Sequence, residues 1–365
     1  MKKIISVVGA RPNFMKIAPI HFGFSRYRDC VTHLICHTGQ HYDEKMSKVF
    51  FDELGMPKPD FYLGIGSGSH AVQTAGVMVS FEKILLDEKP DLVIVAGDVN
   101  STIACSLVAK KLHIAVAHVE AGLRSFDREM PEEINRILTD TISDLLFVTE
   151  ETGLKNLKKE GIADEKVFFT GNVMIDSLVN NSSVIDASDI LDKLRIRKGG
   201  YLLATIHRPS NVDKQESLSG ILRLLNKYAQ GRKVIFPVHP RTRSNIKAFG
   251  LENDISPDLI LTEPIGYIDF LNLVKNTTLV ITDSGGIQEE STYLGVQCVT
   301  LRDNTERPVT VTTGTNHLAG TDMSKADLII SEVLGGKIKK GTIPALWDGK
   351  AAERICSQII QHILG

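Results

Sequence analysis

The segment from Leu279 to Glu290 carries the clearest chemical pattern in the chain. An apolar run leads into two adjacent glycines and then into a helical segment. Without a Cβ, Gly285 and Gly286 let a ligand approach the backbone, and the free amides and the dipole of a helix start favour phosphate. Glu290 would repel phosphate and is better suited to accept hydrogen bonds from sugar hydroxyls. The pattern predicts a diphosphate cradle, although Ser284 as an ordinary helix N-cap remains the alternative.

Basic side chains follow other apolar runs, where they could neutralise such a ligand. Arg11 and Lys16 flank a predicted helix start after the first run, and a guanidinium and an ammonium there could both reach a phosphate. His207 follows an apolar run in the second half of the chain and could change its charge near neutral pH. Solvated basic residues and a hydrogen-bonded histidine are the competing interpretations.

Three carboxylates occupy comparable positions. Asp98 and Glu120 end predicted strands, and Glu132 opens a predicted helix. Ligands of open parallel sheets bind beyond the carboxyl ends of the strands, so polar residues there are candidate ligand contacts. A helix cap for Asp98 and stabilisation of the helix dipole by Glu132 are the alternatives.

The elements that must position these residues alternate between strands and helices, which indicates an α/β protein with parallel sheets. A polar stretch from Ser182 to Gly200 separates two series of strands and is typical of a connection between domains. A final helix is expected from Ala351 to Leu364, with isoleucines on one face. The predicted strands are Ile4–Val8, His33–His37, Leu92–Ala96, Ala115–Val119, Leu145–Val148 and Val167–Thr170, then Tyr201–Thr205, Val234–Val238, Leu259–Leu261, Leu279–Ile281, Cys298–Leu301 and Leu328–Ile330.

Composition excludes several classes of protein. With 42 basic and 44 acidic residues the net charge is -2, which gives no electrostatic footprint for nucleic acid. No apolar stretch approaches a membrane span or a signal sequence. The five cysteines are scattered without metal-type spacing, which favours reduced thiols in the cytoplasm.

Two cofactor patterns are absent or incomplete. The segment Gly64–Ser69 resembles a dinucleotide-binding loop, but serine replaces its last glycine and no ribose-binding acid follows. The histidines form no HExxH motif and no cluster with cysteine at zinc spacing. The sequence therefore predicts neither a nicotinamide cofactor nor a metal.

A series of motifs runs in order along nearly the whole chain: Gly9–Pro12, His118–Arg124, Pro131–Arg136, His207–Arg208, Asp283–Glu290, Arg302–Pro308 and Gly320–Asp322. Together they closely resemble the non-hydrolysing UDP-N-acetylglucosamine 2-epimerases. The resemblance implies an α/β fold of the glycosyltransferase B type, with two Rossmann-like domains and an active-site cleft between them. The implied domains are residues 1–171, joined by a C-terminal helix at 352–365, and residues 172–351. A cofactor-free homodimer is also implied.

The resemblance assigns roles residue by residue. Asp98, Glu120 and Glu132 match carboxylates placed around the sugar, and His207 matches an essential histidine. The residues that match contacts to UDP are Arg11, Lys16, Ile265, Phe270, Ser284, Gly285, Gly286, Glu290 and Arg307. Of these, Glu290 matches the ribose ligand, and Phe270 and the backbone of Ile265 match positions beside uracil.

The implied reaction expels UDP from C1 of the sugar as the C2 proton is removed. The bound 2-acetamidoglucal then takes UDP back with protonation from the opposite face. Two faces require two acid/base groups, and carboxylates with shifted pKa values suit both roles. Cations and backbone amides would stabilise the departing diphosphate.

Two departures from the family pattern limit the comparison. Arg208–Asn211 lacks a carboxylate that many members carry in this loop. Gln40–Asp43 lacks the second glutamine of a motif that binds an activating substrate molecule, and Gly64–Ser69 contains no arginine. We therefore expect no activation by substrate.

The sugar is left open by the sequence. Relatives with similar motifs act on UDP-2,3-diacetamido-glucuronate, and hydrolysing relatives release free N-acetylmannosamine. A glycosyltransferase of the same fold and a nucleotide-sugar sensor are the more remote alternatives.

Overall fold

The computed structural model describes residues 1–39 and 53–364. The chain forms two compact units, Met1–Asn180 with Ala345–Gly365, and Asn181–Pro344. The expected junctions at residues 171 and 351 thus fall inside the first unit. Helix α7 (Val173–Asn180) belongs there because it packs on α1 (Arg11–Gly23) with Ile175 and Leu178 buried. Trp347 belongs there because its Nε1 donates a 2.9 Å hydrogen bond to the carbonyl of Thr149.

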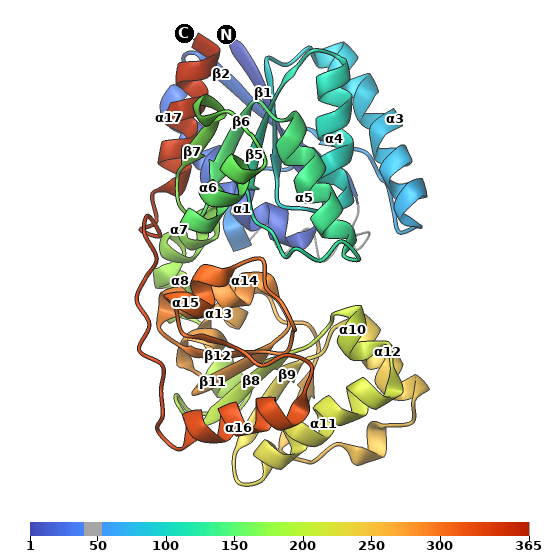
Figure 1. Ribbon diagram of the computed structural model, residues 1–365, viewed down its shortest axis with the longest axis vertical. Coiled ribbons are helices and arrows are strands. Elements are labelled where there is room, and N and C mark those ends of the chain that lie inside the picture. Colours follow the sequence, from blue (N-terminus) through green and yellow to red (C-terminus); the bar gives the residue numbers. More distant parts are fainter. Residues whose placement is uncertain (40–52, 365) are drawn as a thin grey trace. The chain divides into compact units, whose positions relative to one another are not determined.

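The first unit is built on a parallel sheet covered by helices (Figure 1). The sheet has seven strands in the order β3-β2-β1-β4-β5-β6-β7. Its central strands read as continuous buried apolar runs, as expected for a sheet covered on both faces. The strands are β1 (Lys2–Val8), β2 (Val31–His37), β3 (Phe61–Tyr62), β4 (Leu92–Ala96), β5 (Ala115–Ala121), β6 (Leu145–Val148) and β7 (Val167–Phe169).

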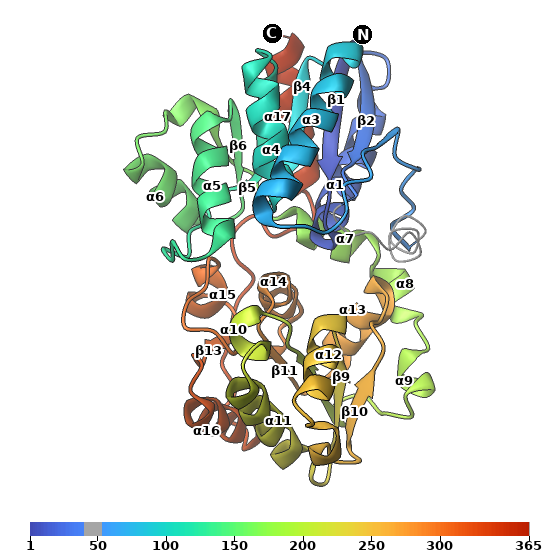
Figure 2. The ribbon, with the colours of Figure 1, turned by 90° about the vertical axis from the view of Figure 1, so that its right-hand side faces the viewer.

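Helices cover both faces of this sheet. On one face α3 (His70–Glu88), α4 (Asn100–Lys111) and α5 (Pro131–Ile142) lie side by side (Figure 2). On the other, α17 (Ala351–Leu364) packs on α1 and α7 with Ile355 and Ile359 buried. Its first amides donate to Asp176 of α7, from Ala351 at 3.1 Å and from Ala352 at 2.7 Å. The remaining elements are α6 (Glu151–Lys159) and the 3₁₀ turns Phe24–Tyr27 and Asp164–Lys166.

The second unit has its own parallel sheet, six strands in the order β10-β9-β8-β11-β12-β13. Strands and helices enclose two apolar clusters, one on each face. The strands are β8 (Tyr201–Thr205), β9 (Lys233–Pro237), β10 (Leu259–Thr262), β11 (Leu279–Thr282), β12 (Gln297–Thr300) and β13 (Asn316–Leu318). The helices are α8 (Ser182–Asp186), α9 (Ile190–Lys193), α10 (Pro209–Val212), α11 (Gln215–Ala229), α12 (Pro240–Ala248), α13 (Tyr267–Asn276), α14 (Gly285–Leu294), α15 (Pro308–Thr312) and α16 (Met323–Leu334), with a 3₁₀ turn at Glu252–Asp254.

The strand predicted at Leu328–Ile330 is wrong. These residues lie in α16, where Ala326, Ile330 and Val333 are buried on one helical face. Asp322 caps this helix through the amide of Ser324 at 2.8 Å. A short apolar run is compatible with either element, and here the helix cap and the spacing of three and four residues decide it.

The polar stretch from Ser182 to Gly200 is not featureless. It contains the short helices α8 and α9, whose Ile185 and Ile190 are buried. Within the part of the chain that the structure describes, no helix is long and apolar enough to cross a membrane.

Candidate functional site

Each unit gathers predicted site residues at the carboxyl ends of three neighbouring strands, the edge where open parallel sheets bind ligands. In the first unit these strands are β1, β4 and β5, and in the second they are β8, β11 and β12. The two groups of residues are described in turn.

Glu120 and Lys16 form a buried ion pair in the first unit, with side chains only 5% and 6% exposed. Glu120 has a φ of 75°, which is unusual for a residue with a side chain, and the register of β5 against β6 shifts at this point. Space for the ammonium exists because residue 97 is glycine: an added Cβ there would lie 2.8 Å from Lys16 Nζ. The backbone of β5 is therefore distorted where it presents this carboxylate.

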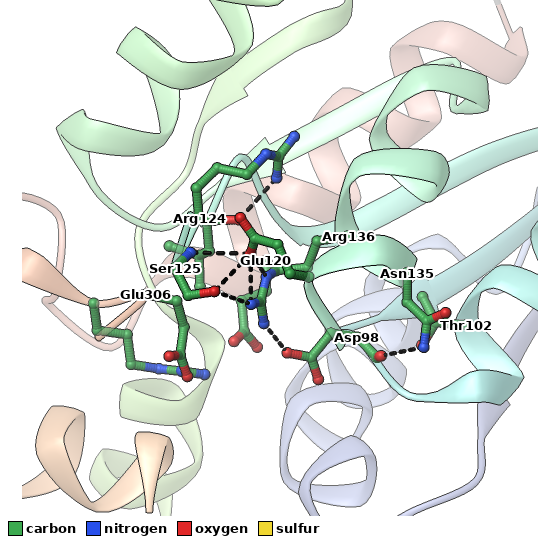
Figure 3. Close-up of polar contacts among 12 residues, drawn as sticks. Asp98, Thr102, Glu120, Arg124, Ser125, Asn135, Arg136 and Glu306 are labelled. Atoms are coloured by element: carbon green, nitrogen blue, oxygen red, sulfur yellow. Dashed lines mark hydrogen bonds and ion pairs between the residues drawn. The ribbon is translucent and has the colours of Figure 1, made fainter. Parts of the chain in front are cut away.

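Asp98 pairs with Arg136 of α5, whose guanidinium points toward it in Figure 3. Glu133 holds the same guanidinium from behind, through Arg136 Nη2 at 2.7 Å and Nε at 3.0 Å. Burial raises the pKa of Glu133, but the amide of Ser125 and the charge of Arg136 outweigh it and leave that pKa lowered. A fixed cation thus faces Asp98, and the N-cap position of α4 is Val99 rather than Asp98.

The other two candidates of the first unit lie at helix starts. Arg11 is the first residue of α1. Glu132 is half-buried in the first turn of α5, a position that suits stabilisation of the helix dipole. Its proposed contact with the sugar therefore remains a prediction.

A second, fully buried group lies behind these residues. His118 of β5 and Asp140 of α5 are both 0% exposed, and His118 Nδ1 lies 2.6 Å from Asp140 Oδ1. His118 Nε2 donates to the carbonyl of Gly97 at 2.8 Å. Asp140 Oδ2 accepts from the amide of Gly122 at 3.0 Å and pairs with Arg124 at 2.7 Å. Burial raises the pKa of Asp140, but His118 and Arg124 outweigh it, so the pKa is lowered.

In the second unit His207 is oriented by Asp283. The imidazole is 43% exposed, and its Nδ1 lies 3.0 Å from the fully buried carboxylate. Asp283 also accepts from the amides of His207 and Arg208 and from Asn211 Nδ2, at 2.8 to 3.1 Å. Burial raises the pKa of Asp283, but His207 and these donors lower it further than burial raises it. Asp283 is therefore a fixed anion that holds the imidazole by one nitrogen.

The start of α14 presents backbone amides. Ser284 occupies the N-cap position but makes no side-chain capping hydrogen bond, and Ser284, Gly285 and Gly286 are half-buried between buried neighbours. A Cβ added to Gly285 would lie 2.4 Å from Arg307 Nη1. Glycine thus lets the guanidinium lie against the helix start, beside amides that suit an anion.

Arg307 is held by two buried carboxylates. Glu289 Oε1 lies 2.9 Å from Arg307 Nε, and Glu306 pairs with Arg307 Nη1. Glu306 also pairs with Arg302 Nη2 at 2.7 Å, and Arg208 Nη2 lies 3.8 Å away. Burial raises the pKa of Glu306, but the three arginines lower it well below its usual range. The cluster keeps a net excess of guanidinium groups close to the start of α14.

The remaining candidates lie in α14 and α13. Glu290 is 3% exposed on α14. Phe270 is 9% exposed and packs in the apolar cluster with Tyr201 and Leu273, and Ile265 packs against the same cluster. Their predicted contacts with ribose and uracil remain predictions, and the activator motif at Gln40–Asp43 lies outside the described residues.

The described residues include no cluster of three or more histidine, cysteine, aspartate or glutamate side chains that could hold a metal ion. Asp98, Glu120 and Asp283 are instead paired with basic side chains.

Several important residues were not singled out from the sequence. Asp140, Asp283, Arg136 and Glu306 hold the candidates in place. Asp283, Arg136 and Glu306 lie inside the motifs, which was their only signal, and Asp140 lies outside them and gave none. Their partners lie up to 98 residues away in the chain, as Arg208 does from Glu306, which no local pattern reports.

Comparison with known proteins adds independent information. Residues 26–360 match the family model described as UDP-N-acetylglucosamine 2-epimerase. A Methanococcus maripaludis protein named UDP-N-acetylglucosamine 2-epimerase homolog is 50% identical over 327 residues, covering 88% of this chain and 90% of the relative. A Pseudomonas aeruginosa UDP-2,3-diacetamido-2,3-dideoxy-D-glucuronate 2-epimerase is 39% identical, covering 98% and 99%. The crystal structure of Methanocaldococcus jannaschii UDP-GlcNAc 2-epimerase with UDP-GlcNAc and UDP is similar with a TM-score of 0.90 and 43% identity, covering 99% and 100%.

Proposed function

Since this chain belongs to the UDP-N-acetylglucosamine 2-epimerase family, we propose that it interconverts UDP-N-acetylglucosamine and UDP-N-acetylmannosamine. The observation that carries the proposal is the pair of carboxylates at the ends of β4 and β5. These strands are neighbours in the sheet, and each carboxylate, Asp98 and Glu120, faces a fixed cation. Two acid/base groups at one sheet edge are what inversion at a carbon atom requires.

The chemistry proceeds by elimination and addition. The proton on C2 of the sugar is not next to a carbonyl, so its removal needs a leaving group on C1. The C1–O bond to UDP and the C2–H bond break, which gives 2-acetamidoglucal and UDP. Addition of UDP to C1 and of a proton to the other face of C2 gives the epimer. A proton is exchanged without net oxidation, so side chains suffice and no cofactor is needed.

Asp98 and Glu120 are the proposed proton-transfer groups. Arg136 holds Asp98 and Lys16 holds Glu120 through ion pairs. An ionised carboxylate can remove the proton from C2, and a protonated one can return it. Glu132 is a third carboxylate assigned to the sugar on the strength of the resemblance alone.

Residues of the second unit are proposed to hold the nucleotide. The amides of Ser284, Gly285 and Gly286 and the guanidinium of Arg307 suit a diphosphate, and they stabilise the charge that develops as it leaves C1. His207, held at Nδ1 by Asp283, directs its other nitrogen away from this carboxylate. It is suited to donate a hydrogen bond or a proton to a phosphate oxygen. Arg11, Lys16, Ile265, Phe270 and Glu290 complete the proposed nucleotide contacts.

The deciding experiment is incubation with UDP-N-acetylglucosamine alone, followed by proton NMR of the anomeric signals. A second set of signals from UDP-N-acetylmannosamine is expected, with UDP retained. In deuterated water the product should carry deuterium at C2, because the bound glucal is protonated by an exchangeable acid. Product without deuterium contradicts elimination, and release of free N-acetylmannosamine indicates a hydrolysing enzyme.

UDP-2,3-diacetamido-glucuronate is the second candidate substrate, favoured by the relative from Pseudomonas aeruginosa. Parallel incubations at equal concentrations compare kcat/KM for the two sugars. A larger value for the diacetamido sugar would reassign the substrate and leave the reaction unchanged.

A cytoplasmic homodimer is proposed as the working state. All five cysteines are free thiols, which suits a reducing compartment. Light scattering coupled to size exclusion measures the mass, for which twice 40.2 kDa is expected. A single-chain mass at working concentration would reject the dimer.

A further inference from the structure

We infer that His118 and Asp140 form a buried clamp that positions both proposed proton-transfer carboxylates of the first unit. The inference rests on the proposed function, because it concerns the placement of Asp98 and Glu120. Neither member of the clamp reaches a ligand itself, since both side chains are 0% exposed. They are therefore positioning residues.

One arm of the clamp holds the turn that carries Asp98. His118 Nε2 donates to the carbonyl of Gly97 at 2.8 Å, in the residue directly before Asp98. The amide of Gly97 is held in turn by the carbonyl of Val119 at 3.0 Å. Gly97 has a φ of 70°, so this turn uses a conformation that few other residues adopt. Both backbone polar groups of Gly97, the residue before Asp98, are thus fixed to β5.

The other arm holds the strand around Glu120. Asp140 binds the ring of His118, two residues before Glu120, and the amide of Gly122, two residues after it. Between these two anchors Glu120 adopts its φ of 75°. A left-handed backbone is unfavourable for a residue with a side chain, and it persists only where surrounding contacts enforce it. The carboxylate of Asp140 supplies contacts on both sides of the strained residue.

The clamp belongs to a larger network of charged side chains. A carboxylate oxygen of Asp140 and the carbonyl oxygen of Gly97 face the two ring nitrogens of His118. Asp140 is shared with Arg124, and Arg124 Nη2 lies 2.6 Å from Glu160. Removal of one member of such a buried network leaves its partner with an uncompensated charge. The network thus couples the turn before Asp98 to the strand around Glu120.

Two substitutions separate the two arms. In His118→Gln the side-chain amide reaches the place of Nε2 and keeps the bond to Gly97, but it loses the bond to Asp140. In His118→Asn the amide takes the place of Nδ1 and keeps Asp140, but it ends short of Gly97. We expect each to lower kcat by about 10- to 100-fold, because displacement of a reacting group by about 1 Å can cost that much. KM and the calorimetric Kd for UDP should stay within about twofold, since the carboxylates and not the nucleotide contacts are displaced.

His33→Gln is the matched control. His33 lies on β2 of the same unit, 2.7 Å from Ser6 Oγ, and contacts none of the proposed catalytic residues in the structure. The substitution His33→Gln should lower the melting temperature. At a temperature where all variants are folded, it should leave kcat unchanged. If the His118 variants remain folded and keep kcat within about twofold of the unsubstituted chain, the clamp is rejected.

A nitrogen NMR measurement tests the clamp without activity or substitution. The hydrogen on Nε2 of His118 should exchange slowly with solvent, because it is buried and bonded to the carbonyl of Gly97. Rapid exchange of this hydrogen in the folded chain would overturn the inference. Failure of the proposed function would look different: the unsubstituted chain would not epimerise the UDP-sugar, whatever the state of the His118 ring.

Discussion

Each unit contains one histidine held by a buried aspartate, and the two pairs differ in exposure. In the first unit His118 is 0% exposed, and its second nitrogen binds the carbonyl of Gly97. In the second unit His207 is 43% exposed and held by Asp283 through Nδ1, and its Nε2 makes no hydrogen bond within the described residues. The same two side chains therefore build a closed network in one unit and a group open to a ligand in the other.

The difference shows that a histidine and aspartate in contact do not by themselves mark a reacting group. Whether such a histidine can contact a ligand depends on what binds its second ring nitrogen. Where a backbone carbonyl occupies that nitrogen, the histidine is suited to position its neighbours, and the proposed reacting groups are the carboxylates Asp98 and Glu120. Where it is open, the histidine itself can meet the substrate.

The largest expected effect is that of Glu120→Gln in the first unit. The change keeps the shape of the side chain and removes its ability to transfer a proton, so kcat should fall by about 10²- to 10⁴-fold. Calorimetry should show UDP binding within about twofold of the unsubstituted chain. Glu129→Gln, at an exposed position, is the control and should leave both values unchanged. Near-normal turnover of Glu120→Gln would make the Lys16 ion pair a purely structural contact.

Arg307→Ala should weaken the binding of UDP, whereas Glu120→Gln lowers kcat. Loss of a charge-assisted contact to the diphosphate costs about 1.5 to 3 kcal/mol, so the Kd for UDP should rise by about 10- to 100-fold. Calorimetric titration measures it, with the exposed Arg241→Ala as control. If the two variants bind UDP with equal affinity, Arg307 does not contact the nucleotide.

Asp283→Asn tests the pair of His207 and Asp283, in which the imidazole is exposed. The amide nitrogen cannot accept from the donors that surround Asp283, and the imidazole loses the anion that fixes its Nδ1 hydrogen. We expect kcat to fall by about tenfold or more, in line with the loss of one hydrogen bond of 1.5 kcal/mol or more to a charged group. The control is Asp213→Asn, which lies at an exposed ion pair with Arg241. An unchanged kcat in a folded Asp283→Asn protein would show that the orientation of His207 does not matter.

The smallest expected effect concerns a histidine whose partner is another histidine. His33 Nδ1 lies 2.9 Å from His21 Nδ1. Burial, with a smaller effect of His21, lowers the pKa of His33 to about 3. The unfolded chain takes up this proton below pH 6.5 while the folded chain does not, so stability is constant above pH 6.5 and falls as the pH drops toward 3. Between pH 6.5 and 5.5 the loss is about 1 kcal/mol, because the unfolded histidine is already half protonated at pH 6.5.

Urea unfolding at these two pH values measures the difference. His33→Gln should remove most of it, and His113→Gln, at an exposed position, should not. An equal dependence on pH in both variants would show that His33 is protonated in the folded chain.

The fold was largely predictable because the buried strands are continuous apolar runs. The strands at 92–96, 145–148 and 201–205 have the predicted bounds, and so does the final helix. Strand β13 was missed because it begins with Asn316 and His317, polar residues that bear no β pattern. In α16 the run from Leu328 to Ile330 resembled a strand because three apolar residues do not reveal a period.

The candidate site was only partly predictable. Residues at the ends of strands, such as Asp98 and Glu120, could be found because topology fixes where strand ends meet. The buried pair behind them, His118 and Asp140, could not be found in this way, because its contact depends on how α5 packs against the sheet. Exposure is also a property of packing, so the sequence could not tell the roles of His118 and His207 apart.

The way α17 completes the first unit has a consequence for synthesis of the chain. Ile355 and Ile359 fill the surface of α1 and α7, and Asp176 binds the first amides of α17. The second unit, Asn181–Pro344, is continuous in the chain, whereas the first unit needs segments from both sides of it. The first unit therefore lacks α17 until the whole second unit has been translated. The unit whose synthesis begins first is thus the last to be finished, and a pause in translation before α17 would prolong the exposure of its unfilled apolar groove.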